Sequence, residues 1–251
     1  MEAPAVHRRP GGEVRSLRVR GHLVNYRESG AGPPVMLVHG LGCSAGWWRD
    51  VVPGLARHHR VIVPDLPGFE LAPGAAPFRL QEGSAVLGRL LERLDVGPAS
   101  LVGHSLGALV CMRIAARAPA IVDRLALISP PVRTAGPAFR HHAVPLARTA
   151  AGLPMGALAR VTLGGIGRSP LAIWRAAEEM LHTDHLIGLH AVRAPTLLLW
   201  GRDDQLVPLE GAGALLQAIP GATLSVIEAG HSPMLDAPDA LTRELLTFLA
   251  S

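Results

Sequence analysis

The sequence has 251 residues, of which 49% are hydrophobic, and its formal charge is +4. This apolar content is enough to bury one sizeable core, so we expect one large domain or a domain with an insertion. The basic residues are scattered arginines without any lysine, and aromatic residues make up only 4% of the chain, which argues against a nucleic-acid-binding surface.

Targeting and cysteine signals are equally sparse. No apolar run approaches the ~20 residues that a membrane span needs, and the first fifteen residues lack the apolar region of a secretory signal. The two cysteines, Cys43 and Cys111, are too few for a disulfide framework and do not have a metal-ligand spacing. We therefore expect a cytoplasmic protein with free thiols.

Short apolar runs alternate with longer segments of helical periodicity, which is typical of an α/β protein with a mostly parallel sheet. The first two runs precede any helical segment, so we expect an antiparallel start, and the later runs have the continuous apolar character of strands buried on both faces. The sequence predicts eight strands, at 16–21, 22–28, 34–40, 60–66, 99–104, 124–130, 196–201 and 223–230. It predicts helices at 47–59, 80–96, 105–119, 209–220 and 239–250, the last with start signals at Pro238 and Asp239.

One segment interrupts this alternation. Residues 134–190 have helical and Gly/Pro-containing sequence without a convincing strand, and they are too numerous for an ordinary connection. We expect an α/β core at 1–133 and 191–251, with 134–190 inserted as a helical cap over one end of the sheet.

Two segments have the Gly-x-Ser-x-Gly spacing that presents a nucleophile: "GCSAG" at 42–46 and "GHSLG" at 103–107. The chemistry requires a sharp turn from strand into helix, which holds the serine in a strained backbone conformation with small residues on both sides. Ser105 meets this requirement, because an apolar run ends at Val102 and a helical segment begins at Leu106. Ser44 lies a few residues before the next helical segment and fits a helix N-cap better.

A serine hydroxyl needs a base, and an acid must orient that base. His231 follows the last predicted strand in a Gly/Pro-marked loop, where catalytic groups of open α/β sheets gather. Asp203 and Asp204 directly follow the strand at 196–201, between the serine and the histidine in sequence. The residues alone leave both aspartates open as the acid.

The tetrahedral intermediate needs two backbone N–H donors, each worth ~3 kcal/mol of barrier. We expect one from Leu106, which follows the nucleophile, and one from Leu41 in the glycine-flanked loop "HGLG". The same loop places His39 and Gly40 as candidates for substrate contact. His104 is expected to support the turn.

Five segments, "HGLG", "VPDLPGF", "GHSLG", "WGRDD" with "LVP", and "GHSPMLDAPD", occur in an order and spacing that resemble the α/β-hydrolase superfamily over nearly the whole chain. The resemblance implies a Ser105, Asp204 and His231 triad, an oxyanion hole of the Leu41 and Leu106 amides, and a mainly helical cap. It places the acid third after Gly201, which favours Asp204 over Asp203. One departure is Glu70, which stands where the family commonly has glycine and which we expect to be a solvated loop residue.

The resemblance also narrows the reaction. Relatives similar to haloalkane dehalogenases and epoxide hydrolases have aspartate at the nucleophile position, dienelactone hydrolases have cysteine, proline iminopeptidases have tryptophan after the serine, and carbon–carbon bond hydrolases commonly have tryptophan after the histidine. This chain has Ser105, Leu106 and Ser232 at those positions. The expected activity is therefore hydrolysis of carboxylic esters through an acyl-enzyme, without a cofactor or metal.

The predicted cap is rich in apolar residues and contains Trp174, so we expect a small-molecule ester with a hydrophobic acyl or alcohol group, although the same residues could simply pack the cap. His141, His142 and the histidines of "HTDH", at 182 and 185, fit surface positions better than a metal site. Thioester or enol-lactone hydrolysis and perhydrolase side activity stay open, as does a slow-turnover ligand receptor on a hydrolase scaffold. The sequence does not determine the oligomeric state.

Overall fold

A computed structural model describes residues 5–9, 12–68, 78–132 and 170–251. The described part of the chain contains a nine-stranded sheet with the order β1-β2-β3-β5-β4-β6-β7-β8-β9. The strands are β1 (Ala5–Arg9), β2 (Gly12–Val19), β3 (His22–Ser29), β4 (Pro34–Val38), β5 (Arg60–Pro64), β6 (Ala99–His104), β7 (Val122–Ile128), β8 (Thr196–Gly201) and β9 (Thr223–Ile227).

All eight expected strands are present, as β2 to β9, and the expectation of a mostly parallel sheet is confirmed. Strands β4 to β9 pair in parallel, whereas β1, β2 and β3 pair in antiparallel fashion at one edge, which is the antiparallel start that the sequence predicts. Strand β1 was not expected, because its sequence AVHRR has no apolar run that marks a strand.

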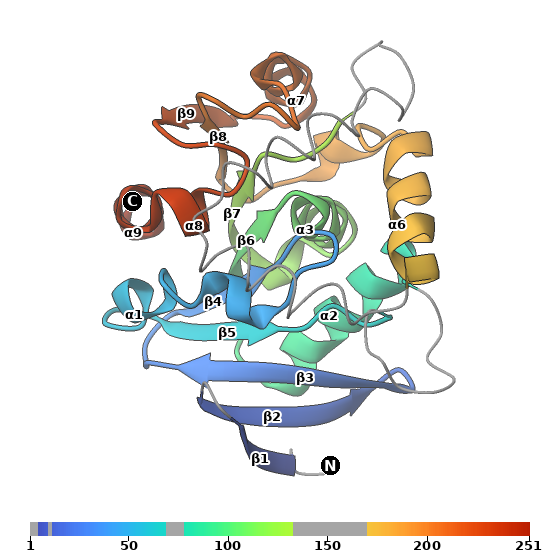
Figure 1. Cartoon of the computed structure of the whole chain (residues 1–251), viewed down its shortest axis with the longest axis vertical. Helices are drawn as coiled ribbons and strands as arrows, with labels where there is room; N and C mark the ends of the chain where they lie inside the picture. The colour runs from blue at the N-terminus through green and yellow to red at the C-terminus, as the bar shows by residue number, and fades with distance from the viewer. Residues whose placement is uncertain (1–4, 10–11, 69–77, 133–169) are drawn as a thin grey trace.

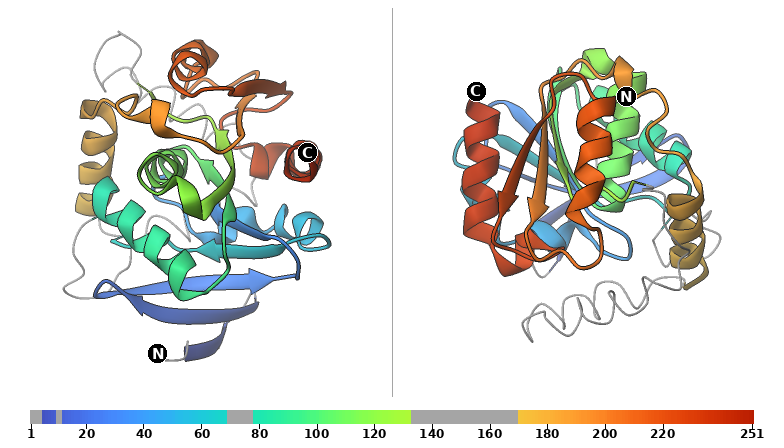
Figure 2. Two further views of the ribbon diagram at one scale, coloured as in Figure 1. Left: turned by 180° about the vertical axis from the view of Figure 1, so that it is seen from behind. Right: turned by 90° about the horizontal axis from the view of Figure 1, so that it is seen from above.

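Helices cover both faces of this sheet (Figures 1 and 2). The α-helices are α1 (Val52–Leu55), α2 (Leu80–Arg93), α3 (Leu106–Arg117), α6 (Pro170–His182), α7 (Ala212–Ala218), α8 (Pro233–Asp236) and α9 (Pro238–Ala250), with 3-10 turns η1 (Ala45–Trp48), η2 (Pro119–Ile121), η4 (Leu189–Ala191) and η5 (Leu209–Gly211). Helix α9 begins at Pro238, as its start signals predict.

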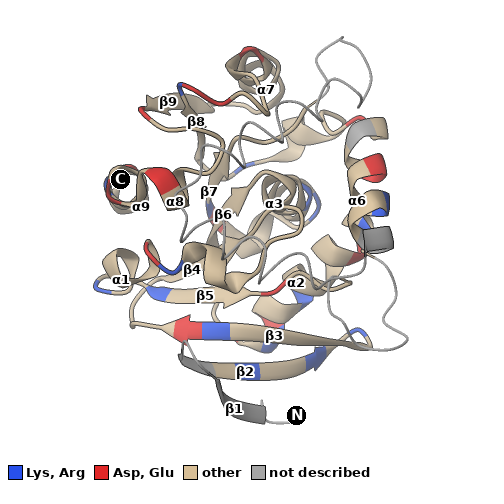
Figure 3. Ribbon diagram, viewed as in Figure 1, with Lys and Arg blue, Asp and Glu red and all other residues tan. Residues whose placement is uncertain are grey.

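The central strands are buried on both faces because both sides of the sheet carry an apolar cluster. In β4, Met36 and Val38 belong to the cluster beneath α2, α3 and α7, and Val35 and Leu37 belong to the cluster beneath η1, α1 and α9. Strands β4, β6 and β8 contain no Lys, Arg, Asp or Glu, whereas β5 and β7 have charged residues near their amino-terminal ends (Figure 3). Because strands β4 to β9 are parallel, their carboxyl ends lie at the same edge of the sheet, where the following loops can form a site.

The predicted cap lies only partly within the described residues. Helix α6 packs beside α2 (Figure 1), and a turn and η4 lead from it to β8. Residues 134–169 of the predicted cap, with His141 and His142, lie outside the described ranges, as does Glu70. None of the described helices has the length and apolar character that a membrane span requires.

Candidate active site

Ser105 lies on the turn that joins β6 directly to α3. Its backbone has φ 51° and ψ −118°, a left-handed conformation that a residue with a side chain rarely adopts. The N–H of Ser105 donates to the carbonyl of Ile128 at the end of β7, at 2.9 Å, which helps to hold the turn in place. The local fold thus presents a strained serine at the carboxyl edge of the sheet.

The two glycines of "GHSLG" explain why small residues must flank this serine. A Cβ atom at Gly107 would lie 2.3 Å from the carbonyl oxygen of Val38, and one at Gly103 would lie 2.5 Å from the carbonyl oxygen of Gly107. Any side chain at either position would push the first turn of α3 away from β4 and β6.

Ser44 has the same motif spacing and a different conformation. Its backbone is extended, at φ −150°, and it stands at the N-cap position of η1, but its side chain makes no capping hydrogen bond. The Asp65 carboxylate accepts the hydrogen bond from the Ala45 N–H instead, at 2.8 Å. The expected capping bond from Ser44 is therefore wrong, and a carboxylate distant in sequence takes its place.

His231 and Asp204 form a buried hydrogen-bonded pair between the loops that follow β9 and β8. The Asp204 Oδ2 atom lies 2.9 Å from Nδ1 of His231, and the two residues are 9% and 6% exposed. The other carboxylate oxygen, Oδ1, accepts the backbone N–H groups of Leu206 and Val207 at 2.9 and 2.8 Å. Asp203, the other candidate acid, is exposed.

The surroundings of Asp204 keep its carboxyl group ionised. Burial by itself raises the pKa of a carboxyl group, but the hydrogen bond and charge of His231 act in the opposite direction, with smaller help from the Val207 N–H. These interactions outweigh burial, so the pKa of Asp204 lies below its ordinary value. An ionised Asp204 holds the proton of His231 on Nδ1 and leaves Nε2 free to act as a base.

The pair lies beside the serine turn. The ring of His104, the residue before Ser105, has its centroid 4.9 Å from that of His231, and His104 Nε2 lies 2.8 Å from the His231 carbonyl oxygen. In the part of the chain that the structure describes, the Ser105 hydroxyl makes no hydrogen bond to His231. Such bonds are often long in unliganded sites and shorten when substrate is bound.

Asp236 is a further residue of this loop, and the sequence analysis assigns it no role. Its Oδ2 atom accepts the N–H of Gly230 at 2.8 Å, which fixes the backbone directly before His231. Burial raises the pKa of Asp236, and backbone N–H groups that include that of Gly230 partly offset the increase. Its position within "GHSPMLDAPD" is the one signal in the sequence.

The loop after β4 lies against the serine turn. A Cβ atom at Gly40 would lie 3.4 Å from Cβ of Ser105 and 3.0 Å from Nδ1 of His104. The Gly40 carbonyl accepts the Cys43 N–H at 3.3 Å and faces Nδ1 of His39 at 2.9 Å. Because the peptide is trans, the N–H of Leu41 points away from that carbonyl.

His39 supports this loop from within the core. Its ring is fully buried, and Nε2 accepts the Leu66 N–H at 2.9 Å, so the ring proton is on Nδ1 and is donated to the Gly40 carbonyl. Both ring nitrogens are therefore occupied. The expectation that His39 contacts substrate is corrected to a role in orienting the Gly40–Leu41 peptide.

The described part of the predicted cap includes Trp174, His182 and His185. Trp174 is 56% exposed on α6, whereas the preceding Ile173 approaches the loop, because a Cβ atom at Gly42 would lie 3.8 Å from Ile173 Cδ1. A contact between Trp174 and substrate stays a prediction. His182 pairs with Glu178, and Nε2 of the buried His185 lies 2.7 Å from the Met180 carbonyl oxygen.

Among the residues placed by the structure, no group of three or more His, Cys, Asp or Glu side chains could hold a metal ion. Cys111 is buried in the core, and burial raises the pKa of its thiol. Cys43 is partly exposed, and its Sγ atom lies 3.3 Å from the Leu41 carbonyl oxygen.

Comparisons with known proteins agree with this architecture. The model of the alpha/beta hydrolase family matches residues 35–244, and the chain therefore belongs to that family. The chain is 34% identical to a pimeloyl-[acyl-carrier protein] methyl ester esterase of Methylococcus capsulatus, over 89% of this chain and 97% of the relative. It is 30% identical to a magnesium-chelatase 30 kDa subunit of Rhodobacter capsulatus, over 87% of each chain.

The solved structures show the same fold. The enol-lactonase from Burkholderia xenovorans LB400 superposes with a TM-score of 0.82 over 94% of this chain and 100% of the other, at 22% identity. At this identity the likeness concerns the fold alone. Together with the family match, it identifies the molecule as an α/β-hydrolase-fold protein of the hydrolase class.

Proposed function

We propose that the protein is a serine hydrolase that cleaves carboxylic esters of small to medium hydrophobic substrates through an acyl-enzyme. The observation that carries the proposal is the strained Ser105 turn beside the buried Asp204–His231 pair. A nucleophile at a strand-to-helix turn with an acid-oriented histidine next to it is the arrangement that acyl transfer requires.

In the proposed reaction, His231 Nε2 removes the Ser105 proton as Oγ attacks the ester carbonyl. The tetrahedral intermediate collapses, the bond to the alcohol oxygen breaks, and His231 gives its proton to the departing alkoxide. Water, deprotonated by His231, then attacks the acyl-enzyme, and the carboxylic acid leaves as Ser105 regains its proton. Asp204 stabilises the imidazolium in both halves of the cycle.

The proposed oxyanion hole consists of the backbone N–H groups of Leu41 and Leu106. Leu106 is the first residue of α3, so its N–H has no partner within the helix. The Leu41 N–H is directed by the peptide whose carbonyl His39 holds. Donors of this kind, set in place before the reaction, stabilise the developing oxyanion without reorganisation.

Apolar side chains near the proposed oxyanion loop favour a hydrophobic substrate group. Leu41 and Ile173 are partly buried against the core, and a Cβ atom at Gly40 would lie 3.4 Å from the Cβ atom of Ser105. The methyl ester named for the relative from Methylococcus capsulatus is consistent with an ester as the reacting group.

A panel of p-nitrophenyl esters of increasing acyl length tests the proposal. We expect turnover that depends on chain length and disappears in the Ser105→Ala variant. Thioesters and lactones measured alongside distinguish the neighbouring activities that the same residues could serve. Absence of turnover on the whole panel, or full activity of Ser105→Ala, would contradict the proposal.

The second candidate is a protein with slow turnover that acts through a partner, and the relative named as a subunit of magnesium chelatase favours it. It predicts a burst in which one acyl group is transferred to each protein molecule, with release of one alcohol, followed by negligible turnover. Continuous turnover in the first assay would rule it out.

A further inference from the structure

The ring of His104 lies where three segments of the site meet. It is 2% exposed, its Nε2 atom is 2.8 Å from the His231 carbonyl oxygen, and the two rings are 4.9 Å apart. Its Nδ1 atom faces Gly40, where an added Cβ atom would lie only 3.0 Å away. Since Ser105 is the next residue, one imidazole contacts the loops of the proposed base and oxyanion hole and is joined to the nucleophile.

The hydrogen bond to His231 determines which nitrogen of His104 carries the proton. A carbonyl oxygen only accepts, so Nε2 is the donor, and Nδ1 has no hydrogen-bond partner among the residues that the structure describes. Burial, with a smaller contribution from the nearby His231, lowers the pKa of His104 to about 3. The ring therefore stays neutral, with its proton on Nε2, over the range in which an esterase works.

We propose that His104 is a positioning residue for the reaction, which sets the distance between the proposed base and the nucleophile by holding the His231 backbone. The inference rests on the function proposed above. Its hydrogen bond joins two points 127 residues apart in sequence, one directly before the nucleophile and the other at the histidine itself.

This bond supplies a restraint that the hydrogen bonds of Asp204 and Asp236 do not. Asp204 holds the His231 ring at Nδ1, and Asp236 holds the N–H of Gly230. Neither hydrogen bond connects the His231 loop to the serine turn. The structure shows no hydrogen bond between the Ser105 hydroxyl and the His231 ring. A displacement of about 1 Å in such a pair can cost on the order of 100-fold in rate.

Two amide substitutions that differ only in reach test the inference. In His104→Gln the side-chain amide nitrogen lies near the position of Nε2 and can still donate to the His231 carbonyl, whereas in His104→Asn it lies near the position of Nδ1 and falls short. We expect His104→Gln to keep kcat within about threefold, and His104→Asn to lose on the order of 10-fold to 100-fold in kcat with little change in KM.

Steady-state ester hydrolysis provides both constants, and circular dichroism and thermal unfolding show that each variant is folded. An undiminished kcat in a folded His104→Asn, or equal losses in both variants, would overturn the inference. Those results require an active unaltered protein, whereas the lack of any ester turnover by the unaltered protein would instead overturn the proposed function.

A measurement on the unaltered protein tests the same hydrogen bond without relying on activity. Nitrogen-15 NMR of labelled histidines should show His104 as a neutral ring protonated at Nε2 from pH 5 to 8. A ring that is protonated at Nδ1, or that titrates in this range, would overturn the inference even if both variants proved unfolded.

Discussion

Ser105 and Ser44 stand at the centres of two segments with the same glycine spacing, but their backbone conformations differ. Ser105 has a positive φ of 51°, and both flanking glycines are pressed against backbone atoms. Ser44 is extended, and a Cβ atom at Gly46 would meet only the Ser44 Oγ at an ordinary 3.5 Å. The difference shows that the same glycine spacing occurs in two local structures, and that only the one at Ser105 has backbone atoms packed closely against both glycines.

The largest expected effect separates the two serines by activity. Ser105→Ala removes the proposed nucleophile and should reduce kcat/KM for esters by at least about a thousandfold. Ser44→Ala is the matched control and should change it by less than about twofold, because the Ser44 side chain makes no capping bond. Comparable losses in both variants would show that the backbone difference does not assign the roles.

The next effect separates the two aspartates after β8. Asp204→Asn keeps the shape of the side chain but can no longer hold the proton of His231 on Nδ1, so kcat should fall by on the order of 10⁴-fold. Asp203→Asn changes an exposed residue and should stay within about twofold. Steady-state kinetics at pH 8 measures both, and a larger loss for Asp203→Asn would reverse the assignment.

A stability measurement compares the glycines themselves. Gly107→Ala places a Cβ atom 2.3 Å from the Val38 carbonyl oxygen, so the backbone must move, and we expect the free energy of unfolding to fall by about 3 kcal/mol. Gly46→Ala should change it by less than about 1 kcal/mol. Chemical denaturation followed by fluorescence gives both values, and equal losses would contradict the contact argument.

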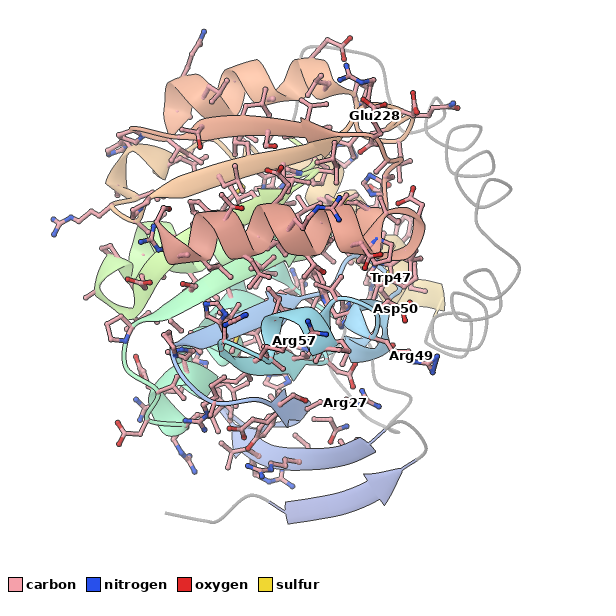
Figure 4. All side chains as sticks on the ribbon, turned by 90° about the vertical axis from the view of Figure 1, so that its left-hand side faces the viewer. Arg27, Trp47, Arg49, Asp50, Arg57 and Glu228 are labelled. Carbon is pink, nitrogen blue, oxygen red and sulfur yellow. The ribbon has the colours of Figure 1, made fainter. Side chains whose placement is uncertain are left out.

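The smallest effect concerns the start of η1. Asp65→Ala removes the acceptor of the Ala45 N–H and should cost about 1 kcal/mol of unfolding free energy. Ser44→Ala should cost clearly less, because the Ser44 side chain makes no capping hydrogen bond. The turn itself is held by Trp47, which packs into the core, whereas Arg49 and Asp50 are exposed (Figure 4). A greater loss from Ser44→Ala than from Asp65→Ala would restore Ser44 as the cap.

The sequence predicts the fold well because apolar runs mark strands that are buried on both faces. All eight expected strands lie within a few residues of their predicted positions, whereas the edge strand β1 was not predicted because its sequence AVHRR has no apolar run. The order of the site residues is also readable, since Ser105 and His231 each follow an identifiable strand.

The sequence does not reveal the contacts between residues that are distant along the chain, or the direction in which individual side chains point. The bond between Asp65 and Ala45 spans 20 residues, and that between His104 and His231 spans 127. The apolar content of α6 does not indicate that Ile173 approaches Gly42 while Trp174 is 56% exposed. The orientation of His39 likewise depends on Leu66, a partner from the loop after β5.

The most direct test of the central claim is the site of covalent labelling. The protein is treated with a fluorophosphonate, digested, and the modified residue is identified by tandem mass spectrometry. We expect one phosphonylated residue, Ser105, and greatly slowed labelling in Asp204→Asn. Modification of Ser44, of another residue, or of none would contradict the assignment of the nucleophile to the strained turn between β6 and α3.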